Sequence, residues 1–250
     1  MVSMENDLWI TLFTGIYVLA TVFIPKILKE RGVISKFVAR KLIHSFSGLA
    51  IFIAPYLKYP IIAGSLSLIM TIITRGSKKK SKTKPLRELF DAISEDEELE
   101  SGYLQGPFSY CLGITILMLI FIPFADKYFF PITSILIMMF ADSAAAIVGR
   151  KYGTHHITIP WVGSKRTVEG SLTFLLVALI LSFLSFGFFG YILPGNSMIL
   201  NLEQIFIFSV SLSLISTGLE LLSPSKYDDL IIPLGSTLLI SLLAIILKIW

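Results

Sequence analysis

The chain has 250 residues, of which 54% are hydrophobic and only 15% are charged, and its mean hydropathy is +0.80. Soluble domains usually carry about a quarter charged residues, so this composition excludes a water-soluble globule. The net charge of +4 is accounted for by loops beside a membrane and requires no nucleic-acid partner.

The apolar residues fall into long uncharged runs separated by charged loops. A membrane helix needs roughly 20 such residues, whereas a strand of a membrane barrel would alternate in polarity. In chain order, the predicted spans are 8–24, 42–57, 59–74, 101–125, 128–141, 170–202, 204–219 and 230–247. The sequence therefore predicts an all-α polytopic membrane bundle of about eight helices, forming a single integral membrane domain over 1–250.

Two of these runs do not have the length of one span. The run 128–141 is too short, so its helix is expected to continue through Asp142 to about Gly149. The run 170–202 is too long, and it is expected to break near Gly190 to Gly195, where Pro194 lies.

The basic residues are distributed unequally between the two sides that eight spans would create. Of the 21 lysines and arginines, 18 fall in four loops that share one side, namely 25–41, 75–106, 149–169 and 223–229. The positive-inside rule makes these loops cytoplasmic and places both termini outside. We therefore expect a charged cytoplasmic loop at 75–106 and a second cytoplasmic loop at 149–170.

Ionisable side chains within the apolar segments are candidates for function. They cost several kcal/mol in lipid unless they are paired or hydrated. Four lie at the predicted cytoplasmic ends of their helices, namely His44, Asp142, Glu169 and Glu220. A pocket that opens to the cytosol and borders lipid would collect them.

Two predicted helices carry a polar stripe at helical spacing. One consists of Asp142, Ala146, Gly149 and Gly153, and the other of Ser209, Ser213, Ser216 and Glu220. Small residues allow membrane helices to approach closely, and serines hydrogen-bond across the contact, so packing explains most of each stripe. Carboxylates are poor packing residues in lipid, so Asp142 and Glu220 indicate function.

The segment 149–170 has the composition of a nucleotide-binding loop. Glycines, hydroxyls and backbone amides at the start of a helix form an anion site, and nearby lysine or arginine adds fixed positive charge. The candidate phosphate-binding residues are Gly149, Arg150, Gly153, Lys165, Arg166, Thr167, Gly170 and Ser171.

Carboxylates beside this loop suit a divalent metal that bridges phosphates. Mg²⁺ takes one or two carboxylates together with phosphate oxygens, and Asp142 and Glu169 are near the loop in sequence. The neighbouring His155 and His156 are expected to be ordinary surface residues. A complete Walker A loop is absent, so the residues alone predict a phosphate and metal site that serves a substrate dissolved in the membrane.

Several short motifs occur in an order and spacing typical of one family. They are Arg40-Lys41-x-x-His44 with Gly48, Gly102-x-x-x-Gly106-Pro107, Asp142-x-x-Ala145-x-x-x-Gly149-Arg150-x-x-Gly153, Arg166-Thr167-x-Glu169-Gly170-Ser171, and Glu220 followed by Asp228-Asp229-Leu230 with Pro233. From about Arg40 to its C-terminus the chain thus resembles the polyprenol kinase family, which includes dolichol kinase, phytol kinase and CTP-dependent diacylglycerol kinase. Two positions depart from the family pattern: Arg166 replaces a frequent lysine, and Tyr227-Asp228-Asp229 stands where the family has D-D-N.

The resemblance implies a CTP-dependent lipid kinase that phosphorylates a polyprenol or related lipid alcohol of the dolichol, phytol or geranylgeraniol type. It implies Mg²⁺ as cofactor, with the candidate ligands Asp142, Glu169, Glu220, Asp228 and Asp229. The implied catalytic residues are Asp142, Glu169, Asp228 and His44, of which His44 or a carboxylate accepts the proton of the alcohol. Arg40 and Lys41 are expected to join the residues of loop 149–170 in binding the nucleotide.

Two other functions remain open at this point. Phosphatidate cytidylyltransferase resembles the chain in the aspartate-glycine and K-[ST]-x-E-G segments, but its C-terminal signature is absent and residues 218–235 fit the kinase pattern. A secondary transporter would place its acidic residues near the midplane within repeated halves. Here the acidic residues are predicted at one side, and no internal repeat is evident, so the kinase is preferred.

Overall fold

The computed structural model describes residues 4–94, 96–163, 166–224 and 227–250. The α-helices are α1 (Met4–Glu30), α2 (Lys36–Ser47), α3 (Ile61–Gly76), α4 (Lys84–Ile93), α5 (Asp96–Ser101), α6 (Gln105–Ile120), α7 (Phe129–Leu136), α8 (Asp142–Tyr152), α9 (Val168–Gly187), α10 (Leu202–Leu222) and α11 (Asp228–Ile246). Two 3₁₀ segments, η1 (Gly48–Tyr56) and η2 (Ile122–Lys127), and two π segments, η3 (Ile137–Ala141) and η4 (Phe188–Ile192), adjoin them. Strands β1 (His156–Ile157) and β2 (Arg166–Thr167) form one small antiparallel hairpin.

The described chain divides into two compact units, which are treated separately below. The first unit comprises the described residues of Met1–Ile53 and Leu57–Leu119, and the second comprises those of Ala54–Tyr56 and Ile120–Trp250.

Among the described residues, six helices are long and apolar enough to cross a membrane. They are Asn6–Glu30, Lys36–Tyr56, Phe129–Tyr152, Val168–Ile192, Leu202–Leu222 and Asp228–Ile246. Two shorter apolar helices, α3 and α6, coincide with the remaining predicted runs. The predicted all-α, multi-pass membrane architecture is confirmed, whereas eight spans and the placement of the termini stay predictions.

Both adjustments made to the predicted runs are confirmed. The helix that begins at Phe129 continues through Asp142 and ends at Tyr152. The long run breaks after Ile192, in the segment that contains Pro194, before the next helix begins. The side chain of Asn201 starts that helix by accepting a hydrogen bond from the backbone N–H of Gln204, whose own side chain bonds back to Asn201.

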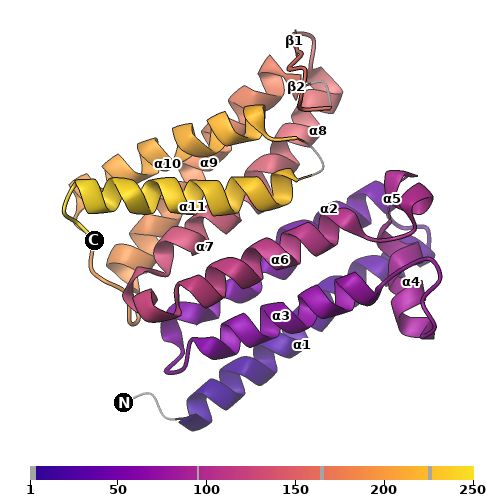
Figure 1. Ribbon diagram of the computed structural model, residues 1–250, viewed down its shortest axis with the longest axis horizontal. Coiled ribbons are helices and arrows are strands. Elements are labelled where there is room, and N and C mark those ends of the chain that lie inside the picture. The colour runs from indigo at the N-terminus through magenta and orange to yellow at the C-terminus, as the bar shows by residue number, and fades with distance from the viewer. Residues whose placement is uncertain (1–3, 95, 164–165, 225–226) are drawn as a thin grey trace. The chain divides into compact units, whose positions relative to one another are not determined.

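In the first unit, α1 packs against α2 and α3 (Figure 1). Near the start of α1 the carboxylate of Asp7, which is only 1% exposed, accepts hydrogen bonds from the backbone N–H groups of Lys58 and Tyr59 at 3.1 and 3.0 Å. Asp7 thereby satisfies two donors in the tight turn between η1 and α3, which explains a buried acid at the edge of an apolar helix.

The predicted loop 75–106 contains two helices that the sequence analysis did not identify. Helix α4 buries Phe90, Ala92 and Ile93, which form a small apolar cluster with Leu104. Leu89 and Ile93 lie at helical spacing with Leu86, so an amphipathic pattern was present in the sequence beneath the charged residues.

In the second unit, α9 packs against α8 and α10, and α11 packs against α10 and α7 (Figure 1). Its core is aromatic: the ring of Phe130 lies edge-on to Phe186 and Phe208, with centroids 5.9 and 5.2 Å away, and all three are fully buried. Ring pairs with this geometry add stability beyond the apolar area that they bury.

The serine stripe of α10 faces the interior of this unit. Ser209, Ser213, Ser216 and Glu220 are all buried. The hydroxyl of Ser216 bonds to the carbonyl of Leu212 in its own helix and lies 3.0 Å from the hydroxyl of Ser236 on α11. The packing explanation of the serines is confirmed, and Glu220 ends this stripe at the candidate site.

Candidate active site

A cavity of about 440 Å³ in the second unit gathers most of the predicted phosphate-binding residues. Its walls come from α8, the β1–β2 hairpin, the start of α9 and the end of α10. The residues that line it are Asp142, Ala145, Ala146, Gly149, Arg150, Gly153, His156, Arg166, Thr167, Gly170, Ser171 and Glu220. Segments that are far apart in the sequence thus contribute polar side chains to one cavity.

Glycines allow α8 and α9 to approach closely enough to form this wall. A Cβ atom on Gly170 would lie 2.9 Å from Thr167 Oγ1 and 3.2 Å from the carbonyl oxygen of Ala145. A Cβ atom on Gly149 would lie 2.8 Å from the same hydroxyl. A larger residue at either position would have to displace Thr167, so the small-residue stripe of α8 serves this contact.

The N-terminus of α9 opens at the cavity. Thr167 precedes the helix, and its hydroxyl accepts a hydrogen bond from the backbone N–H of Gly170 at 3.1 Å. The first turn of a helix carries N–H groups without helical partners and a partial positive charge. The cavity therefore has a backbone element that favours an anion, and Thr167, Gly170 and Ser171 lie at it.

Arg166 connects two carboxylates that lie more than 50 residues further along the chain. Its Nη1 atom is 2.7 Å from Oε1 of Glu220, and its Nη2 atom is 3.5 Å from Oδ2 of Asp228. Glu220 is only 3% exposed, and Ser171 donates a second, long hydrogen bond of 3.5 Å to it. The Arg166 charge compensates the buried carboxylate, which would otherwise be costly at the end of a membrane helix.

The guanidinium of Arg166 retains capacity to bind an anion. Its Nε and Nη2 atoms are buried and make no hydrogen bond with the described residues, apart from the 3.5 Å ionic contact of Nη2 with Asp228. Buried donors of this kind are normally satisfied, because an unmade hydrogen bond costs about 1–3 kcal/mol. A phosphate oxygen would satisfy them, and Arg150 adds a second positive charge to the lining.

Asp142 and Glu220 are the two carboxylates that line the cavity. Asp228 does not line the cavity, but its carboxylate lies 3.5 Å from Arg166, which does. The next residue, Asp229, donates its backbone N–H to Asp228 Oδ1 at 2.9 Å. Within the described residues no group of three or more His, Cys, Asp or Glu side chains is placed to hold a metal ion. Mg²⁺ that is also bound by phosphate needs only one or two carboxylates, so Asp142 and Glu220 fit it.

Glu169 does not line the cavity. Its Oε1 atom accepts hydrogen bonds from the hydroxyl and backbone N–H of Thr154, at 2.6 and 3.1 Å, and lies 2.8 Å from Nδ1 of His155. It thereby fixes the turn that follows α8. The predicted catalytic and metal-binding roles of Glu169 stay predictions, and Lys165 lies outside the described residues.

His156 is a lining residue that the sequence analysis interpreted as an ordinary surface histidine. Strand β1 pairs with β2 so that His156 lies opposite Thr167. The pairing places His156 beside Thr167, and both residues line the cavity. No signal in the sequence revealed this register, because each strand has only two residues.

Arg40, Lys41 and His44 lie on α2 in the first unit. Arg40 Nη1 is 2.7 Å from Oε2 of Glu98, whose other oxygen accepts the backbone N–H of Gly106 at 2.9 Å. The His44 ring packs 4.7 Å from that of Tyr110, whose hydroxyl donates to the His44 carbonyl. Glu98 thus joins the Arg40 motif to the Gly106 motif, and the sequence analysis did not single it out.

No family model and no solved structure matches the chain. Among curated proteins, a phytol kinase of Synechocystis sp. is 27% identical over 239 residues, which cover 94% of this chain and 92% of that protein. The predicted resemblance to the polyprenol kinase family is confirmed. Because the similarity covers nearly the whole chain, it includes both the Arg40 motif and the cavity that contains Asp142.

Proposed function

We propose that the chain is a membrane kinase that transfers a phosphoryl group from CTP to the hydroxyl of a prenyl alcohol of the phytol or polyprenol type. The similarity to a phytol kinase confirms the enzyme class, a phosphotransferase with an alcohol group as acceptor. One structural observation carries the proposal further. Asp142, Arg166 and Glu220, from three distant segments, meet in one cavity at the N-terminus of α9.

The positive groups of this cavity would hold the nucleotide phosphates. Arg166 would present its Nε and Nη2 donors to phosphate oxygens while Nη1 remains on Glu220. Arg150 and the amides around Gly170 would contact the same group. In phosphoryl transfer the protein mainly positions the reactants and neutralises charge, which these groups can do.

Asp142 and Glu220 would hold Mg²⁺ against the phosphates. When bound, the ion would neutralise negative charge on the transferring group. The sequence also predicts Glu169, Asp228 and Asp229 as ligands. These three residues lie in or beside the first turns of α9 and α11, but they do not line the cavity.

The transfer itself requires one nucleophile and one base. The oxygen of the alcohol attacks the γ-phosphorus, the bond from phosphorus to the oxygen bridging the β-phosphate breaks, and the nucleoside diphosphate leaves. The hydroxyl proton passes to a carboxylate of the cavity, while the role of His44 as an alternative base stays a prediction from the sequence. The products are the prenyl monophosphate and CDP.

The decisive experiment supplies purified protein, in lipid nanodiscs, with γ-labelled CTP or ATP and a panel of lipid alcohols. Label on phytol, geranylgeraniol, dolichol or diacylglycerol would support the kinase and identify its acceptor, and the comparison of donors would test CTP. Release of pyrophosphate with phosphatidate would instead identify a cytidylyltransferase. Uptake of a soluble solute into proteoliposomes without nucleotide hydrolysis would indicate a transporter.

We also propose that the cavity opens to the cytoplasm, because the loop 149–169 beside it is one of the four loops that are predicted on one side of the membrane and together carry 18 of the 21 basic residues. The exposed hairpin offers a test. A His155→Cys variant, made in a Cys111→Ser background, should react with a membrane-impermeant maleimide in inverted vesicles only. Equal reaction in right-side-out cells would contradict this orientation.

A further inference from the structure

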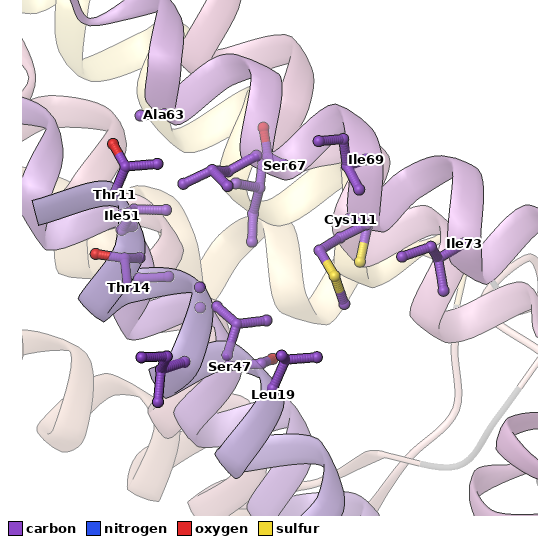
Figure 2. A pocket seen from close by; sticks show the side chains of 18 of the residues that line it. Thr11, Thr14, Leu19, Ser47, Ile51, Ala63, Ser67, Ile69, Ile73 and Cys111 are labelled. Carbon is purple, nitrogen blue, oxygen red and sulfur yellow. The ribbon is translucent and has the colours of Figure 1, made fainter. Parts of the chain in front are cut away.

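The first unit contains a cavity of its own, which is apolar. It has a volume of about 430 Å³ and is bounded by α1, by α2 with η1, and by α3 and α6. In Figure 2, Thr11 and Thr14 of α1 lie on one side of the space, and Ile73 and Cys111 lie on the other. None of the described residues that line this apolar cavity is charged, so a phosphate would find no charged partner there. Further phosphate-binding residues are therefore expected at the cavity of the second unit.

The β1–β2 hairpin brings His156 to the cavity of the second unit. His156 on β1 is paired with Thr167 on β2, and both residues line the cavity. Directly opposite residues of an antiparallel pair have their side chains on the same face. Thr167 also caps the N-terminus of α9, where backbone N–H groups favour an anion. His156 thus lies beside the part of the wall that suits a phosphate, and its ring carries an N–H donor in either tautomer.

The hairpin that positions His156 is too short to be stable by itself. It consists of two residue pairs, His156 with Thr167 and Ile157 with Arg166. An isolated hairpin of two strands is at best marginally stable in water. The place of His156 in the cavity must therefore be fixed by contacts other than those between β1 and β2.

Glu169, in the first turn of α9, makes such contacts with the two residues that precede His156. Its Oε1 atom accepts hydrogen bonds from the hydroxyl and the backbone N–H of Thr154, at 2.6 and 3.1 Å, and lies 2.8 Å from Nδ1 of His155. Its Oε2 atom accepts a longer hydrogen bond, of 3.4 Å, from the backbone N–H of His155. The neighbouring Val168 donates its backbone N–H to the carbonyl of His155 at 2.9 Å. The start of α9 therefore anchors the chain immediately before β1.

A carboxylate suits the position of Glu169 for two further reasons. A negative charge is favourable in the first turn of a helix, and hydrogen bonds to an ionised acceptor are roughly twice as strong as those between neutral groups. Glu169 does not line the cavity, and its oxygens are used by Thr154 and His155. It is thus placed to hold the hairpin rather than to contact a ligand.

We propose that His156 binds the nucleotide phosphates and that Glu169 is a positioning residue, which keeps His156 in the cavity by anchoring the hairpin. This inference rests on the proposed function. The imidazole N–H donates a hydrogen bond to a phosphate oxygen, in addition to the donors that Arg166 offers. Glu169 affects nucleotide affinity through His156 and does not itself touch the nucleotide. Loss of either residue should therefore weaken binding more than it slows transfer in the bound complex.

The first experiment measures binding by calorimetry, with protein in nanodiscs that contain no lipid alcohol. The probes are CTP and inorganic tripolyphosphate, each with Mg²⁺. In His156→Ala we expect both Kd values to rise roughly tenfold, since a hydrogen bond to a charged group contributes about that factor or more. His156→Gln retains a side-chain N–H donor and should stay within about threefold of the wild type. Thr158→Ala, at an exposed position that does not line the cavity, is the control and should bind as the wild type does.

The second experiment tests the positioning role by kinetics. In Glu169→Ala we expect the KM for CTP to rise roughly tenfold while kcat falls less than about threefold, and Glu169→Gln, which retains an acceptor for Thr154, should restore most of the wild-type KM. Glu203→Ala is the matched control and should leave the KM unchanged. Glu203 is exposed and occupies the second position of α10, as Glu169 does in α9. A fall in kcat at an unchanged KM in Glu169→Ala would contradict a positioning role.

The double variant His156→Ala/Glu169→Ala shows whether the two residues act together. Because Glu169 acts through His156, the Kd of the double variant should be no higher than that of His156→Ala alone. Hydrogen exchange of the peptide 154–157 should be at least about tenfold faster in Glu169→Ala than in the wild type, and unchanged in Glu203→Ala. Additive effects on the Kd would overturn the positioning role, as would unchanged exchange.

The outcomes separate this inference from the proposed function. Unchanged Kd values for both probes in His156→Ala would overturn the role of His156. A higher Kd for CTP with an unchanged Kd for tripolyphosphate would also overturn it, because the contact would then be with the nucleoside. A protein that shows the expected series of Kd values, but transfers no label to any alcohol, would retain the inference and overturn the kinase.

Discussion

The cavities of the two units have nearly the same volume, about 440 and 430 Å³. The polar side chains in their walls, however, have different kinds of partner. In the second unit, Arg166 and Glu220 pair across elements, and donors of Arg166 remain for a ligand. In the first unit, hydroxyls such as that of Thr14 bond to their own helix. The comparison shows that the partner of each polar group, rather than the size of a cavity, decides whether it suits an anion or a hydrocarbon.

The cavity of the second unit is called the charged cavity below, because Asp142, Arg150, Arg166 and Glu220 line it. The largest effect should follow from removing one of its carboxylates. For Asp142→Asn we expect phosphoryl transfer to fall at least about 1,000-fold with every alcohol, since Asp142 in its proposed role as a Mg²⁺ ligand would contribute several kcal/mol to the transition state. Transfer of label from CTP measures it. Asp91→Asn, at an exposed position on α4, is the control and should keep the wild-type rate.

A near-normal rate in Asp142→Asn would remove this residue from the catalytic set. The folded state of both variants is checked by size-exclusion chromatography in detergent.

The next largest effect concerns the ion pair of the charged cavity. Arg166→Gln leaves the Glu220 carboxylate buried without its charge partner, which should cost about 3 kcal/mol of unfolding free energy and most of the activity. The double variant Arg166→Leu/Glu220→Leu should regain stability but not activity. Thermal unfolding in detergent and the transfer assay report the two properties separately.

Arg166→Lys distinguishes charge from geometry at the same position. The substitution keeps the positive charge, so we expect activity within about tenfold of the wild type and a raised KM for CTP, because the ammonium lacks the planar fork of arginine. If Arg166→Lys were as inactive as Arg166→Gln, a positive charge alone would not be sufficient at this position.

A smaller effect should come from the contact between α8 and α9. Gly170→Ala places a methyl group 2.9 Å from Thr167 Oγ1, so we expect a loss of about 2 kcal/mol in unfolding free energy. Gly187→Ala has open space and should not destabilise the protein. Equal stability of the two variants would mean that the wall of the charged cavity does not need a glycine.

The smallest effect is expected at the edge of the charged cavity. Glu169→Gln retains an acceptor for Thr154, and its partner His155 is 78% exposed, so stability should change by less than about 1 kcal/mol. We also expect activity to fall less than tenfold. A loss as large as that of Asp142→Asn would instead place Glu169 in the Mg²⁺ set that the sequence predicts.

The sequence was most informative where charge interrupts an apolar helix. Asp142 and Glu220 were identified because carboxylates are rare in such segments, and the structure places both in one cavity although 78 residues separate them. The helices themselves were also predictable, since long uncharged runs have few alternatives in a membrane.

Other features left little trace in the sequence. His156 reaches the cavity through a two-residue strand pairing, and Glu98 joins two motifs from a loop that was read only as charged. The apolar cavity is lined by Leu, Ile and small residues that look the same as lipid-facing ones. Neighbours in space decide these cases, and an isolated sequence does not contain them.

The π segment η3, Ile137–Ala141, lies immediately before Asp142. A π turn holds one residue more than an α turn, and one residue corresponds to about 100° of rotation around a helix axis. The azimuth of Asp142 relative to α7 therefore depends on a single inserted residue. Deletion of Met139 would be expected to restore a regular helix and to swing the carboxylate, together with Ala146 and Gly149, away from Arg166. A change in the number of residues in this segment, without any change in residue type, would therefore be enough to turn Asp142 toward or away from the cavity.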